Sequence, residues 1–192
     1  MDNLNNLSSD QDMDDTYNYH LILKDPKNIS TFITKRINKK INWFFENREH
    51  FLKRYSQADW KEKVINFFYG KHLGLDVKEF GHIVAATDYV LIIDWENDCP
   101  ILKRCLDQDV DLKMVCSTLY NTQYQALLTL IEAGLFFARD YTKIRPDYKY
   151  CREIIYYHKE FEDELAICHL KNLLKPSVIK KILKYHLRSK RG

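Results

Sequence analysis

The scarcity of residues that make tight turns constrains the fold of this chain more than any other feature. Only five glycines and four prolines occur among its 192 residues. An antiparallel sandwich or barrel needs many tight turns, and glycine and proline are prominent among the residues that form them. Hydrophobic residues make up 45% of the chain, which is enough to build a core. The composition therefore predicts an all-α protein of about seven to nine helices.

The clearest periodic pattern begins after Pro26. Apolar side chains recur at steps of three or four residues, which predicts an amphipathic helix. Its other face is basic and carries Lys35, Arg36, Lys39 and Lys40. These four cations, with the basic C-terminal tail, support an alternative function as a nucleic-acid-associated helical protein. A solvated helix face is the favoured interpretation, and nucleic acid is not the expected partner, because no recognisable nucleic-acid-binding module accompanies the pattern.

One stretch could belong to an enzyme. The apolar run 89–93 is followed by three alternating acids, Asp94, Glu96 and Asp98. Carboxylates at the end of a strand can hold magnesium in phosphodiester-cleaving sites. However, Pro100 predicts that a helix begins nearby, so a buried apolar turn with acidic helix caps is favoured. The sequence predicts a protein that is not an enzyme, with no catalytic residue, cofactor or metal.

The cysteines and the charges bear on the compartment. Five cysteines are widely spread with no Cys-x-x-Cys pair, which indicates free thiols in a reducing compartment. The first fifteen residues hold five aspartates and no basic residue, unlike the start of a signal peptide. No apolar run is long enough to cross a bilayer. We expect a cytoplasmic protein without membrane contact, with the nucleus as the alternative location.

Changes in composition divide the chain into four regions. We expect an acidic, disordered leader over 1–24, N-terminal helices over 25–75, a region of degenerate ankyrin-like helices over 76–146, and C-terminal helices with a basic tail over 147–192. Gly134 is expected to take a left-handed conformation and end a helix. Gln125 is expected to complete a capping box with Thr122 at the start of that helix.

The middle of the chain resembles ankyrin repeats. Residues 112–121 resemble an inner repeat helix, and residues 122–134 resemble the outer helix, including the ending Leu-Ile-Glu-Ala-Gly. Residues 100–112 are similar to the outer helix of a preceding unit, whose inner helix would be 78–88. The resemblance implies degenerate helix pairs packed on the N-terminal helices.

The C-terminal end loosely resembles a SOCS box, in which a Leu…Cys helix binds elongin C and a proline-led helix contacts a cullin. The resemblance implies a short helical hairpin and these partner-binding residues: Leu165, Cys168, Leu170, Leu173, Pro176, Ile179 and Leu183. Ankyrin repeats followed by such a box form a familiar arrangement. The resemblance therefore predicts a protein–protein interaction adaptor that uses 28–140 to recruit a target to an elongin B/C–cullin ubiquitin ligase.

Overall fold

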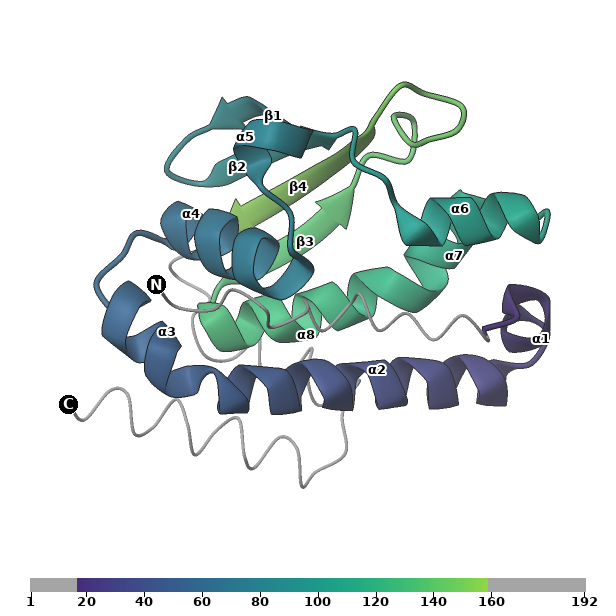
Figure 1. Cartoon of the computed structure of the whole chain (residues 1–192), viewed down its shortest axis with the longest axis horizontal. Coiled ribbons are helices and arrows are strands. Elements are labelled where there is room, and N and C mark those ends of the chain that lie inside the picture. The colour runs from purple at the N-terminus through teal and green to yellow at the C-terminus, as the bar shows by residue number, and fades with distance from the viewer. Residues whose placement is uncertain (1–16, 159–192) are drawn as a thin grey trace, which may run out of the picture.

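The computed structural model describes residues 17–158 of the chain, and these residues form a mixed α/β fold. A four-stranded antiparallel sheet lies on a layer of helices (Figure 1). The all-α prediction is therefore wrong. The C-terminal hairpin predicted on the SOCS-box resemblance lies outside the described residues.

The first two N-terminal helices begin at side-chain caps, and the third does not. The elements are α1 (Tyr19–Leu23), α2 (Pro26–Glu46) and α3 (Arg48–Tyr55). Asp25 accepts a hydrogen bond from the backbone N–H of Lys27, and Pro26 occupies the first helical position, where its missing N–H has no cost. The amphipathic helix predicted after Pro26 is confirmed, and it buries Ile37 and Ile41.

The next segment is helical but differently wound. It comprises α4 (Trp60–Glu62), the π-helix η1 (Lys63–Leu73) and α5 (Val77–Phe80). Gly74 ends η1 with φ of 68°, and its N–H bonds to the carbonyl of Tyr69. Asp76 caps α5 by accepting from the N–H of Lys78. The aromatic side chains of η1 are buried in the core.

The sheet has the strand order β1-β2-β4-β3, with all neighbours antiparallel. Its strands are β1 (Gly81–Ala86), β2 (Val90–Trp95), β3 (Leu135–Arg139) and β4 (Cys151–Tyr157). Two predicted helices are thus corrected. Residues 78–88 were predicted as an inner repeat helix. In the structure they comprise the last part of α5, strand β1 and the start of the turn after it. Residues 147–157, expected to begin the C-terminal helices, form the connection to β4 and strand β4 itself.

These corrections have a physical cause. A strand with one face in water shows alternating apolar and polar residues, and that alternation is the usual sign of an antiparallel strand. In β4, Ile154, Ile155, Tyr156 and Tyr157 are apolar or aromatic without alternation. A short apolar run of this kind fits a helix or a strand equally well, and pairing with β2 and β3 decides for the strand.

The helices between β2 and β3 run nearly without a break. They are α6 (Pro100–Asp107), α7 (Leu112–Val115), the π-helix η2 (Cys116–Tyr120) and α8 (Asn121–Ile131). No non-helical residue separates η2 from α8. The expected pair of repeat helices over 112–134 is therefore one continuous helical path in the structure, which then turns into β3.

The core lies between the sheet and the long helices. α8 packs against both α2 and β3, so it forms the middle of the molecule (Figure 1). Tyr19 of α1 is fully buried, and its hydroxyl lies 2.8 Å from that of Tyr120. The left-handed conformation expected at Gly134 is confirmed, with φ of 85°, and it allows the chain to turn from α8 into β3.

Candidate functional site

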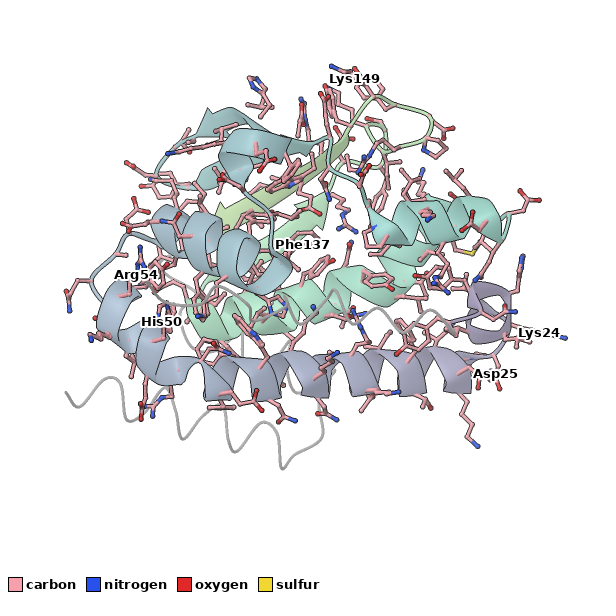
Figure 2. The ribbon with its side chains drawn as sticks, viewed as in Figure 1. Lys24, Asp25, His50, Arg54, Phe137 and Lys149 are labelled. Atoms are coloured by element: carbon pink, nitrogen blue, oxygen red, sulfur yellow. The ribbon has the colours of Figure 1, made fainter. Side chains whose placement is uncertain are left out.

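The two faces of the sheet have different surroundings. On β2, Leu91, Ile93 and Trp95 are buried against the helices, whereas Val90 and Ile92 point to the opposite face and are half-buried. Tyr69 of η1 lies on the helix-covered side, where its ring packs 4.6 Å from that of Trp95. Phe137 also lies on this side, in the interior between sheet and helices (Figure 2).

The opposite face, here called the open face, carries two apolar rows. Directly paired residues of neighbouring strands share a face. One row is Ile92, Ile154 and Ala138; the other is Val90, Tyr156 and Phe136. Five of these six side chains are half-buried and Tyr156 is 37% exposed. A water-facing side of an antiparallel sheet usually carries polar residues, so two apolar rows indicate a surface that another body covers.

A charged pair borders the apolar rows. Arg152 donates from Nε and Nη2 to the two carboxylate oxygens of Asp94, both at 2.7 Å. The hydrogen bond to Asp94 raises the pKa of the Arg152 guanidinium above its usual range. The guanidinium also lies 5.5 Å from the centre of the Tyr150 ring. This charged pair marks the polar end of the open face, and the two apolar rows lie next to it.

The acids considered for an enzyme site do not converge. Asp94 is engaged by Arg152, and Glu96 pairs with Lys149 at 3.1 Å on the surface. Asp98 lies in the segment that leads to α6. Within residues 17–158, no three His, Cys, Asp or Glu side chains are grouped to hold a metal ion.

The edge strand β1 carries further exposed apolar residues, but Ile83 pairs with Ile93 of the helix-covered side and so does not lie on the open face. Ile83 and Val84 are each 42% exposed, and Tyr89 in the β1–β2 turn is 67% exposed. The pairing of β1 with β2 shifts by one residue between Ile83 and Ala85, which is a β-bulge. Bulges twist a sheet edge and make continuous pairing with another strand less favourable. We therefore expect a partner to bind the open face of the sheet rather than to pair with the edge strand β1.

The four predicted basic residues of α2 are divided between two environments. Lys35 and Lys39 are exposed, but Arg36 and Lys40 are buried. Arg36 Nε donates to Gln123 Oε1 at 3.4 Å, and Lys40 Nζ lies 3.0 Å from His72 Nε2. The structure thus does not bring the four cations together on one solvent-facing surface, which the nucleic-acid alternative requires.

The residues predicted to bind elongin and cullin are not placed. Leu165, Cys168, Leu170, Leu173, Pro176, Ile179 and Leu183 all lie outside the described residues. The open face was not predicted, and its β4 residues Ile154 and Tyr156 lie outside the range 28–140 that was expected to bind the target. The signal was present in β4, because apolar residues on both faces of a strand indicate that both faces are covered.

These features define a two-layer α/β protein with an apolar open face on its sheet. Comparison of the chain with protein-family models, with curated proteins and with solved structures finds no match. Among residues 17–158, no helix is both long and apolar enough to cross a membrane.

Proposed function

We propose that this protein is a non-enzymatic interaction module that binds an amphipathic helix of a partner protein on the open face. The observation that carries the proposal is the pair of in-register apolar rows on the side of the sheet away from α8. Exposed apolar surface of this kind marks interaction sites on soluble proteins.

The backbone of the sheet favours a helix as the bound segment. β2 and β4 each have strands on both sides, so their backbone groups are paired within the sheet. The open face therefore presents side chains and few backbone partners. A helix satisfies its own backbone hydrogen bonds and offers a stripe of apolar side chains, which is what such a face can bind.

Recruitment of a ubiquitin ligase is a further part of this proposal and is supported by the SOCS-box resemblance. Residues 165–183 would bind elongin B/C and a cullin while the open face holds the target. Purified full-length protein mixed with purified elongin B/C should form a complex on gel filtration, and Leu165→Asp should abolish it. If the folded wild-type protein forms no complex, the ligase part of the proposal fails and the open-face part is unaffected.

Photo-crosslinking tests which segment covers the open face. A photoreactive benzoylphenylalanine in place of Tyr156 projects from the centre of the second row. In cells, we expect crosslinks to a partner protein that map to an amphipathic helical segment. In the purified protein, crosslinks to residues 159–192 of the same chain, or between two copies, would overturn the proposal in favour of an intramolecular or self-association role.

A matched pair of variants tests whether the crosslinked partner depends on the apolar rows. Tyr156→Lys places a charge on the open face, and Leu21→Lys places the same charge on α1, where Leu21 is 61% exposed. Affinity for the purified partner should fall at least about tenfold in Tyr156→Lys and remain unchanged in Leu21→Lys. Equal affinity of both variants would exclude the open face as the binding surface.

A further inference from the structure

A cavity lies on the opposite side of the sheet from the open face. Its volume is about 840 Å³, which is within the range of small-molecule sites. Its walls come from α2, α6, η2 and α8 and from the ends of β2, β3 and β4. Elements from distant parts of the sequence thus meet around one space.

The cavity is lined by both charged and apolar groups. Its described charged residues are Arg36, Lys103, Arg139, Arg145, Asp98 and Glu153. Positive charges exceed negative charges by four to two in this set. Leu75, Trp95 and Leu106 belong to the apolar part of the lining. A site with a large apolar surface and a few placed polar groups is suited to an amphipathic ligand.

Arg139 supplies a hydrogen-bond donor that no residue within 17–158 accepts. Its Nε and Nη2 atoms both donate to Glu153 Oε1, at 3.0 and 2.5 Å. Glu153 Oε2 accepts from the Tyr69 hydroxyl at 2.9 Å, so the carboxylate is held from both sides. The Arg139 side chain is only 8% exposed, and its Nη1 atom is buried with no hydrogen-bond partner in the described part of the chain.

A buried donor of this kind points to an acceptor that comes from outside the described fold. Nearly all buried polar groups in proteins have a hydrogen-bond partner, so an exception requires an explanation. The guanidinium is also fixed in place between two rings, 5.4 Å from the centre of Tyr124 and 5.3 Å from that of Phe137. Glu153 and the rings hold Arg139 rigid, which is the preorganisation that binding an anion needs.

We propose that this cavity binds a small amphipathic oxyanion, a carboxylate or phosphate on an apolar body. The head group accepts a hydrogen bond from Arg139 Nη1, and the apolar body contacts the wall that contains Trp95 and Leu106. The site is separate from the open face, so this proposal does not depend on the proposed protein-binding function.

Calorimetric titration of the full-length protein tests the site with three probes of matched chain length: decanoate, decyl phosphate and decanol. We expect saturable one-to-one binding of at least one of the two anions, and at least tenfold weaker binding of decanol. The stronger anion identifies the head group as carboxylate or phosphate. Binding of all three probes with equal affinity, or of none, would overturn the proposal.

A variant that removes the donor tests the role of Arg139. Because Arg139→Gln alone would leave Glu153 buried without its cation, the paired change Arg139→Gln/Glu153→Gln is preferred. Binding of the anion should weaken at least tenfold in the folded double variant, and decanol should be unaffected. Arg54→Gln is the control, since Arg54 is an exposed cation on α3 (Figure 2). An equal loss of anion affinity in the double variant and in Arg54→Gln would indicate nonspecific charge attraction and overturn the proposal.

The acidic residues 1–15 are an alternative source of an anion for the cavity, and a variant tests them. The backbone carbonyl of Tyr17 accepts from Gln108 Nε2 at 2.8 Å and so ties this end of the chain to the region of α6. Replacing Asp10, Asp12, Asp14 and Asp15 by Asn distinguishes the two occupants. Anion binding that appears only in this variant would overturn the proposal and assign the site to the chain's own segment. Equal binding in both proteins would support it.

Discussion

The side-chain amide of Gln125 pairs with the backbone of Phe137 in the manner of a neighbouring strand. The Phe137 N–H donates to Gln125 Oε1 at 2.8 Å, and Gln125 Nε2 donates to the carbonyl of Leu135 at 2.8 Å. Among the described strands β3 is an edge strand, so none of them pairs with these two backbone groups on their outer side. Gln125 thus joins α8 to the sheet. The prediction that Gln125 completes a capping box with Thr122 is wrong, because its side chain bonds to β3 instead.

Replacing Gln125 by leucine should destabilise the protein by about 2–4 kcal/mol, because each buried backbone group left unpaired costs about 1–3 kcal/mol. The free energy of unfolding in urea is the measurement. Gln57→Leu, at an exposed position, is the control and should change stability by less than about 0.5 kcal/mol. A small effect of Gln125→Leu would mean that water or a rearranged side chain replaces the amide.

The buried pair of Arg139 and Glu153 should be far more sensitive than the surface pair of Lys149 and Glu96. Glu153→Gln leaves a buried guanidinium without its carboxylate and should cost about 3–5 kcal/mol. Glu96→Gln breaks a pair whose side chains are 48% and 76% exposed, and it should cost no more than about 1 kcal/mol. Urea unfolding compares the two, and similar losses would contradict the burial of Arg139.

Gly134 should not tolerate a side chain. Its φ is 85°, and an added Cβ would lie 2.5 Å from the carbonyl oxygen of His158. Gly134→Ala should therefore lower the melting temperature, with a loss of about 1–3 kcal/mol from backbone strain alone. Gly70 lies inside η1, and an added Cβ would meet its nearest atom at 3.5 Å. Gly70→Ala should leave stability unchanged or raise it by up to about 1 kcal/mol.

Two buried thiols should make the protein less stable in alkaline solution. Burial raises the pKa of Cys105 and of Cys116 from 9.0 to about 12. Both thiols are protonated in the folded and unfolded states below pH 9.0, so their contribution to stability is fully present there. Between pH 9.0 and about 12 the unfolded state loses these protons first, and the free energy of unfolding must fall as pH rises.

The double variant Cys105→Ala/Cys116→Ala isolates this effect. Its free energy of unfolding should decline less steeply with pH across the same window than that of the wild type. The comparison concerns the slope, because the lost side-chain volume lowers stability at every pH. Parallel slopes would assign the alkaline loss to other groups, such as Tyr69, whose pKa burial also raises.

Features that depend only on residues close together in the chain were predictable from the sequence. The positive φ of Gly134, the cap at Asp76 and the apolar stripe of α2 all follow from local sequence. Their physical basis is local as well: absence of a Cβ, a short carboxylate beside free N–H groups, and a repeat near 3.6 residues.

Apart from the apolar run in β4, the candidate site left no signal in the sequence, because it depends on strand pairing. Arg139 lies in the region expected to be ankyrin-like and Glu153 in the region expected to form C-terminal helices, so nothing indicated that they would be direct cross-strand partners. The same pairing aligns Ile92 with Ile154 and creates the open face. Contacts of this kind join residues far apart in the chain, and no local pattern encodes their register.

The sequence by itself determined the long amphipathic helix, several helix ends and the presence of a substantial core. Only the tertiary structure decided that 81–86 and 151–157 are strands, and that Arg36 and Lys40 face inward. The reason is physical: a short apolar segment has no strong intrinsic preference, so the neighbours with which it can pair and exclude water set its conformation.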